Sequence, residues 1–168
     1  SGIEDLVLLL EHPNSWHRET AARLLLERRP EDAESLLSRI FIHSIHWEGR
    51  QRALWVLEGL GLLQPKHIEA AVSDSSPAVR KQAAVLLEKH WDDCPNGELM
   101  AKKMLVDSNQ AVQFQALLSF GDRIDPADFQ LWLHVFSRSI EDKWLTQAML
   151  MVVGDDLPQL VQQFWIRG

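Results

Sequence analysis

A small residue recurs along this chain about every 32 residues, and this repeat constrains the fold more than any other feature. The pattern is clearest in SPAVRKQAAVLLEKH, residues 76–90, where apolar side chains fall on one side of a helix. Its central alanine has counterparts at steps of 32, 30, 33 and 32 residues: Ala21, Ala53, Ala83, Ala116 and Ala148. A fixed period of this length is typical of stacked repeat units.

Large apolar residues follow the alanine three and four positions later in most units. They are Leu24 and Leu25, Val56 and Leu57, Leu86 and Leu87, and Met151 and Val152, while the fourth unit has Ser119 and Phe120. A small residue lets helix backbones approach closely, and the large ones fill the space between units. We therefore expect these positions to form the core.

Each alanine belongs to the second helix of a predicted pair. Seven positions before it, where a helix is expected to begin, stand Asn14, His46, Ser76, Asn109 and Glu141, and Asn and Ser are favoured N-caps. Another amphipathic stretch precedes each: 4–11, 31–43, 65–73, 97–106 and 126–137. Period-2 alternation is missing, so the sequence predicts helices alone.

Two turns resemble those of short HEAT-like repeats: Asp-Ser-Ser-Pro-Ala-Val-Arg at residues 74–80, and Asp-Ser-Asn-Gln-Ala-Val at residues 107–112. Tetratricopeptide repeats are disfavoured because the chain has no tyrosine. We expect an all-α fold, a right-handed α-solenoid of about five HEAT-like helix pairs in a single domain, 1–168. The expected units are 3–29, 30–61, 64–91, 96–122 and 125–155, with 157–168 starting a sixth in a piece excised from a longer protein.

Composition excludes several classes of protein. Of the 168 residues, 46% are hydrophobic, yet no apolar run approaches the roughly 18 residues needed to cross a bilayer. The net charge of −7 is scattered along the chain, which argues against a nucleic-acid groove. Cys94 is the only cysteine, so an internal disulfide is impossible.

Two strings carry a narrower resemblance: HPNSWHRETAARLLLER, residues 12–28, and RALWVLEGLGLL, residues 52–63. They resemble the helical-repeat middle region of secreted planctomycete-type proteins named membrane-bound dehydrogenases or haem-binding proteins (cytochrome c type). In that family a β-propeller precedes the repeats and a Cys-x-x-Cys-His cytochrome domain follows. The resemblance implies a spacer or docking role and a periplasmic or secreted location. It does not place the haem here, because Cys94 is alone.

Motifs for catalysis or cofactors are missing from the sequence. Gly59 and Gly61 flank a leucine at a helix end, without a phosphate-binding loop. His43 and His46, with Glu48 beyond, have spacing that could hold a metal, but they fall at a turn without a third close ligand. We predict no enzyme activity, no cofactor and no metal.

Side chains suited to binding a partner occur at the turn before the second helix in the first two units. The candidate partner-binding residues are His12, Asn14, Trp16, Arg18, His46, Trp47 and Arg50, and the equivalent positions of later units are blander. Trp55 and Trp132 lie within apolar helix patterns and are predicted to be core residues. The arginines Arg18, Arg50 and Arg80 form either an anion-binding row or structural links, for example to Glu19 or Asp74.

Three functions remain open from the sequence. The favoured one is a non-catalytic interaction or spacer module that contacts adjacent domains of its parent chain or another protein. The second is a tetrapyrrole-handling protein similar to the bilin lyases, which are also short HEAT-like proteins. The third is a helical-repeat nucleic-acid reader, disfavoured by the acidic balance.

Overall fold

The computed structural model describes residues 2–125, 128–139, 142–154 and 162. Within them the chain forms ten α-helices and two short 3₁₀ turns and no strand, so the fold is all-α as the sequence predicts. The chain divides into two compact units, residues 1–79 and 80–168, which we describe separately. The predicted sixth helix pair, with Trp165, falls outside the described residues apart from Gln162.

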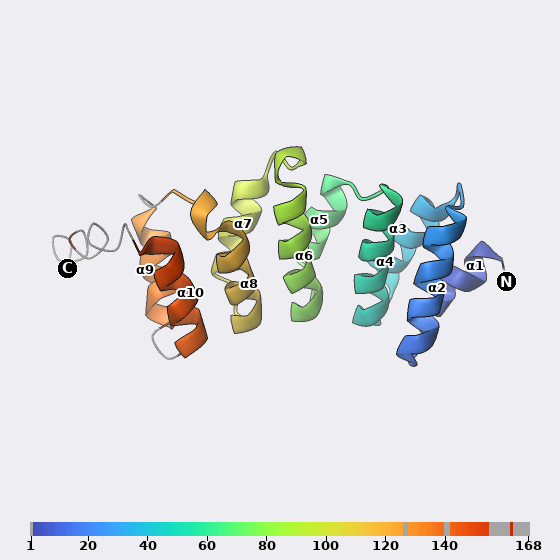
Figure 1. Cartoon of the computed structure of the whole chain (residues 1–168), viewed down its shortest axis with the longest axis horizontal. Helices are drawn as coiled ribbons and strands as arrows, with labels where there is room; N and C mark the ends of the chain where they lie inside the picture. The colour runs from blue at the N-terminus through green and yellow to red at the C-terminus, as the bar shows by residue number, and fades with distance from the viewer. Residues whose placement is uncertain (1, 126–127, 140–141, 155–161, 163–168) are drawn as a thin grey trace. The chain divides into compact units, whose positions relative to one another are not determined.

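Unit 1 contains two packed helix pairs followed by a single helix. Its elements are α1 (Ile3–Leu9), α2 (Ser15–Arg28), α3 (Ala33–His43), α4 (Trp47–Leu60), α5 (Pro65–Val72) and the first residues of α6 (Pro77–Lys89). The helices α1 and α2 pack together, as do α3 and α4; α1 also contacts α3, and α2 contacts α4. Figure 1 shows α2 and α4 side by side in front of α1 and α3.

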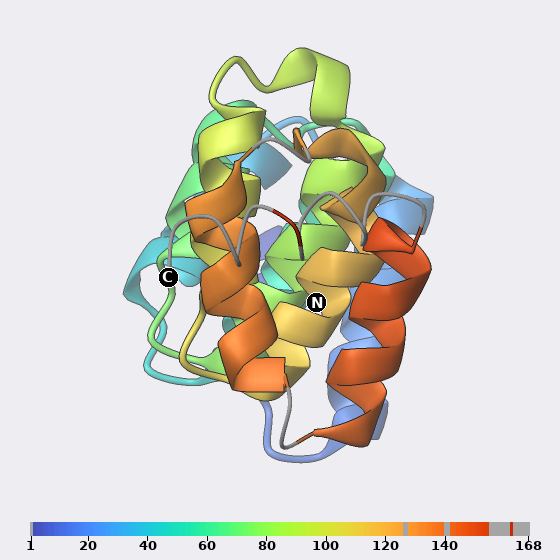
Figure 2. The ribbon, with the colours of Figure 1, turned by 90° about the vertical axis from the view of Figure 1, so that its left-hand side faces the viewer.

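Unit 2 repeats this arrangement with its own helices. After α6 come η1 (Trp91–Asp93), α7 (Gly97–Leu105), α8 (Gln110–Phe120), η2 (Gly121–Arg123), α9 (Phe129–Ser139) and α10 (Lys143–Val153). The pairs are α7 with α8 and α9 with α10, and α8 also packs on α10. Figure 2 shows α9 and α10 side by side, nearest the viewer.

The five repeating alanines, which we call the alanine column, lie in the core of both units. All five alanines are at most 3% exposed: Ala21, Ala53, Ala83, Ala116 and Ala148. Most of the large residues that follow them are buried too, including Leu25, Val56, Leu57, Leu86, Leu87 and Phe120. The small-then-large pattern therefore identifies the packed side of the second helices.

The last unit departs from this pattern at Met151, which is 78% exposed. The buried face of α10 is formed by Leu145, Ala148 and Met149. Met151 follows Met149 by two positions, about 200° round the helix, and so lies on the opposite side. The prediction of Met151 as a core residue is wrong because the buried stripe of α10 is turned toward Leu145 and Met149, away from the position three residues after the alanine.

Helix starts follow the predicted positions in the units where an asparagine is present. The Asn14 side chain accepts a hydrogen bond from the Trp16 N–H, and the Asn109 side chain accepts from Ala111 and Val112. In the last pair the N-cap is Asp142, one residue after the expected Glu141, and it accepts from the N–H groups of residues 144 and 145. Such caps satisfy amides that have no partner within the helix.

Candidate interaction surface

Four turns of the chain share one hydrogen-bonding device. Nine residues before the alanine of the column, a side chain accepts a hydrogen bond from the N–H two residues later. The acceptors are His12 Nδ1 (3.0 Å), Ser44 Oγ (3.0 Å), Asp74 Oδ1 (2.7 Å) and Asp107 Oδ1 (2.8 Å). Three different side-chain chemistries fill the same role, which fixes the turns before α2, α4, α6 and α8.

Arginines stand three positions before the first three alanines of the column, at Arg18, Arg50 and Arg80, and we call them the arginine column. Two of them join one helix pair to the next. Arg50 on α4 donates from Nε and Nη2 to the two carboxylate oxygens of Asp74, both at 2.7 Å. In unit 2, Arg80 on α6 makes the same two-bond contact with Asp107, at 2.7 and 2.8 Å. These four side chains are only 8–13% exposed. Each pair therefore links residues more than 20 positions apart through a nearly dry ion pair.

Electrostatics agree with this geometry. Hydrogen bonding to Asp74 raises the pKa of Arg50 further above its ordinary value. Burial pushes the pKa of Asp107 upward, but hydrogen bonds from Arg80 and from the Asn109 N–H outweigh it, so that the pKa lies below its usual value. The carboxylate of Asp107 is thus stabilised in its charged form by the fold.

The structure favours the structural role for the arginines over the anion-binding one. Arg50 is 8% exposed, and its Nη1 donates to the Ser44 carbonyl while the rest of its guanidinium serves Asp74. Arg50, one of the predicted partner-binding residues, therefore has its donors already used inside the fold. Arg18 bonds differently, because its Nη1 donates to the backbone carbonyls of His12 and Pro13, at 2.7 and 2.8 Å.

The turn between α1 and α2 presents a packed row of rings. The ring of His12 lies 4.2 Å from that of His17, and Trp16 meets His17 edge-on at 5.0 Å between centroids. Trp16 is nevertheless 64% exposed. Because the Asn14 cap and the Arg18 bonds hold the backbone of this turn, Trp16 is displayed from a rigid support.

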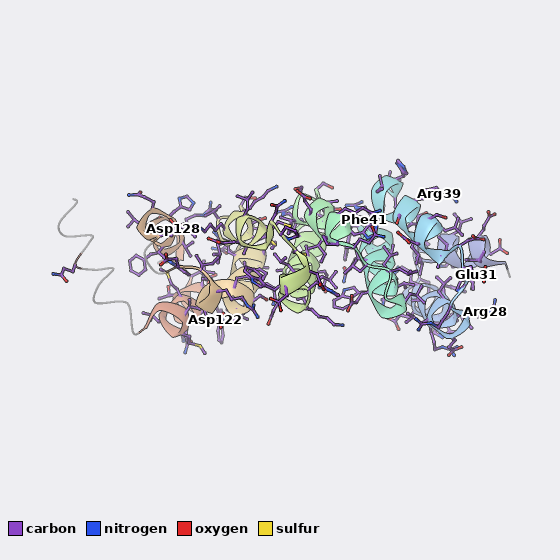
Figure 3. The ribbon with its side chains drawn as sticks, turned by 90° about the horizontal axis from the view of Figure 1, so that it is seen from above. Arg28, Glu31, Arg39, Phe41, Asp122 and Asp128 are labelled. Atoms are coloured by element: carbon purple, nitrogen blue, oxygen red, sulfur yellow. The ribbon has the colours of Figure 1, made fainter. Side chains whose placement is uncertain are left out.

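The turn between α3 and α4 exposes apolar side chains in a short stretch of sequence. Ile42 is 64% exposed, Ile45 is 87% exposed and Trp47 is 42% exposed. His46, the N-cap of α4, makes no side-chain capping bond. Figure 3 shows Phe41 directed between the helices while Arg39 on the same helix projects outward. Ile42 also borders a cavity of about 330 Å³ whose walls include Phe41 and Ala70.

The two turns lie against each other within unit 1. A Cβ placed on Gly49 of α4 would come within 2.9 Å of the Glu11 Cγ, so the first turn of α4 rests on the end of the α1 segment. Farther along, Arg52 Nη2 of α4 lies 3.8 Å from Glu19 Oε1 of α2. We define the turn-edge surface as the half-buried His12 together with the exposed residues of these turns: Asn14, Trp16, Ile42, Ile45, His46 and Trp47.

The histidines at residues 43 and 46 do not belong to a metal-binding cluster in the described part of the chain. There, no three His, Cys, Asp or Glu side chains are grouped so that they could hold a metal ion. Both histidines are exposed at the turn, as is typical of solvated side chains. Over the same residues, no helix is long and apolar enough to span a membrane.

The tryptophans of unit 2 differ in their surroundings. Trp132 is 1% exposed and donates from Nε1 to the Asp125 carbonyl at 3.1 Å, which confirms its predicted core position. Trp91 stacks on Phe120 with centroids 5.5 Å apart, and the Arg123 guanidinium lies over its ring at 5.2 Å. Trp144 is 68% exposed. In unit 1, Trp55 is half-buried, so its predicted core position is only partly correct.

His67 is a buried polar residue that sequence reasoning missed. It is 2% exposed, its Nδ1 accepts from the Gln64 N–H at 3.0 Å, and its Nε2 lies 3.1 Å from Ser38 Oγ. Accepting at Nδ1 requires the neutral ring with its proton on Nε2. Burial, followed by the charge of Lys66, lowers the pKa of His67. Its position three residues after Gln64, where a capping-box side chain stands, is the signal that could have identified it.

Comparison with known proteins adds no identification. No protein-family model matches this chain, and no curated protein is significantly similar to it. The features that bear on function are therefore the turn-edge surface and the packing that supports it.

Proposed function

We propose that this chain is a non-catalytic protein-interaction and spacing module built from HEAT-like helix pairs stacked as a right-handed α-solenoid. Two observations support the repeat architecture. Second helices pack side by side within each unit, α2 on α4 and α8 on α10. The arginine-to-aspartate link and the turn cap recur at equivalent positions, which is how repeat proteins join neighbouring units.

The observation that carries the interaction function is the exposure of Trp16, Ile45 and Trp47 on neighbouring turns of unit 1. Large apolar side chains exposed together on a rigid edge are typical of a binding surface, because contact with a partner removes their apolar area from water. Tryptophan is among the residues that most often dominate protein–protein binding energy. The surrounding polar groups are engaged in the turn, so complex formation would cost little reordering.

The proposed host is a multidomain, haem-containing dehydrogenase-like protein that is periplasmic or secreted. This part of the proposal rests on the resemblance of residues 12–28 and 52–63 alone. In such a host the redox chemistry would belong to other domains, while this module would hold them apart or dock one of them. Sequencing the flanking open reading frame tests the host: a propeller before the module and a Cys-x-x-Cys-His motif after it are expected.

The binding function is tested by changing Trp16 and Trp47 singly to Ala and titrating each variant with the adjacent domain of the parent chain. Each variant is expected to melt close to the wild type and to bind at least tenfold more weakly, since exposed side chains contribute to binding and little to folding. Trp144→Ala, which removes an equally exposed ring from unit 2, serves as the matched control. Unchanged binding in both turn-edge variants, or a large loss of melting temperature, would overturn the proposal.

A further inference from the structure

We propose that the turn-edge surface recognises a positively charged side chain, arginine above all, carried by an apolar segment of the partner, with Trp16 and Glu48 as the receiving pair. The inference rests on the proposed interaction function and specifies the partner's chemistry. The helices α2 and α4 pack together although 18 residues separate them in the sequence, and their equivalent positions are 32 residues apart.

Trp16 and Glu48 lie in the first turns of two helices that pack together, α2 and α4. Glu19 of α2 and Arg52 of α4 approach within 3.8 Å. Trp16 stands three residues before Glu19, and Glu48 stands four residues before Arg52, so each lies one turn closer to the helix start on the same side. The two residues also occupy equivalent positions of the repeat, five before Ala21 and Ala53.

The charge around this spot is acidic. Glu11 and Glu48 belong to it, beside Glu19, whose charge is offset by Arg52, and Glu11 packs against the start of α4 at Gly49. The nearby cations already have partners: Arg52 lies 3.8 Å from Glu19, Arg18 donates to two backbone carbonyls, and Arg50 donates to Asp74. Glu48 contributes to raising the pKa of Arg50, but the two-bond partner of that guanidinium is Asp74. The surface therefore complements a positive charge.

The face of Trp16 is open to a cation. In unit 2, the ring of Trp91 is covered by the Arg123 guanidinium at 5.2 Å. Trp16 is 64% exposed and meets the ring of His17 edge-on. An exposed indole beside a carboxylate binds a guanidinium by combining a cation–π contact with an ion pair. Ile42, Ile45 and Trp47 offer apolar area next to it for the rest of the segment.

The test uses a short peptide with two leucines and three arginines, and matched peptides in which citrulline or glutamate replaces every arginine. Binding to the whole chain is followed by NMR through the indole N–H signals of its tryptophans. The arginine peptide is expected to shift the Trp16 and Trp47 signals, to bind at least tenfold more tightly than the citrulline peptide, and to weaken with added salt. Binding is expected to fall in Trp16→Ala and in Glu48→Gln, and to persist in Trp144→Ala.

Each opposite result overturns the inference in a distinct way. Equal binding of the citrulline or glutamate peptide, lost in Trp16→Ala, would reject the cationic partner while leaving the interaction function intact. Concentration-dependent self-association abolished by Trp16→Ala would identify a second copy of the chain as the occupant. Absence of peptide binding together with unchanged docking of the adjacent domain in both Trp variants would reject the proposed function as well. Melting curves of Glu48→Gln and Trp16→Phe guard against misfolding.

Discussion

The two units of this molecule use the same internal links, but Trp16 of unit 1 and Trp91 of unit 2 have different surroundings. Arg50 and Asp74 in unit 1 have direct counterparts in Arg80 and Asp107 in unit 2. In unit 2, however, Trp91 is covered by Phe120 and Arg123, whereas in unit 1 Trp16 extends into solvent. The difference teaches that the repeat fixes the scaffold, while individual turn residues decide which part of it is available to a partner.

The largest expected effect tests the shared links. Arg50→Met and Arg80→Met should each lower the free energy of unfolding by about 3 kcal/mol, because a nearly buried carboxylate loses its cation. Arg18→Met should cost about 1 kcal/mol, because the bonds of Arg18 go to neutral backbone carbonyls. Urea unfolding measures all three. An equal cost for Arg18→Met would show that the ion pairs are not the main links.

The next prediction contrasts two tryptophans. Trp91→Ala should lower the free energy of unfolding by about 2 kcal/mol, because it removes the ring packed on Phe120 and leaves a cavity near Gly97. Trp16→Ala should change it by less than about 0.5 kcal/mol, as is usual for surface sites. Thermal and urea unfolding of both variants provide the measurement. Comparable losses would mean that Trp16 belongs to the core of unit 1.

The alanine column provides a test in which both units should respond alike. Ala53→Leu in α4 and Ala83→Leu in α6 should each cost about 1–2 kcal/mol, because neither fully buried site has room for three more carbons. Glu88→Leu, at an exposed position of α6, is the control and should cost little. Unfolding midpoints that stay unchanged at both alanines would show that the assigned helix register is wrong.

The smallest expected effect is a difference between the two units in how their stability depends on pH. The folded-state pKa of His67 is lowered, so its unfolded form binds protons more readily, and unit 1 should lose stability as pH falls below about 6.5. The loss at pH 5.5 should not exceed about 1.4 kcal/mol by this linkage. In unit 2, the lowered pKa of Asp107 preserves stability until pH falls below about 4.

Segment-resolved amide exchange between pH 7 and pH 5.5 measures this difference. The amides of unit 1 should lose protection as pH falls over that interval, and the loss should be smaller in His67→Gln. Because the exposed histidines of unit 1 are present in both proteins, the comparison isolates His67. Equal pH dependence in wild type and variant would contradict the neutral, buried state of this residue.

The helices and the alanine column could be predicted from the sequence because they depend on local periodicity and on turn residues. Helical spacing of apolar side chains identified the second helices, and Asn14 and Asn109 marked two of their starts. Even here Met151 of α10 was predicted to be buried and is exposed, since the neighbouring helices decide which side of α10 faces inward.

Tertiary structure alone decided how the polar and aromatic residues are used. The sequence suggested Asp74 as one partner for the arginine column, but only the fold brings Arg50 to it, withdraws Arg50 from the surface and pairs Arg80 with Asp107. It also covers Trp91 and leaves Trp16 open, although both are tryptophans near a helix end. Side-chain burial depends on residues distant in sequence, so a local pattern predicts where a residue stands on its helix but not what packs against it.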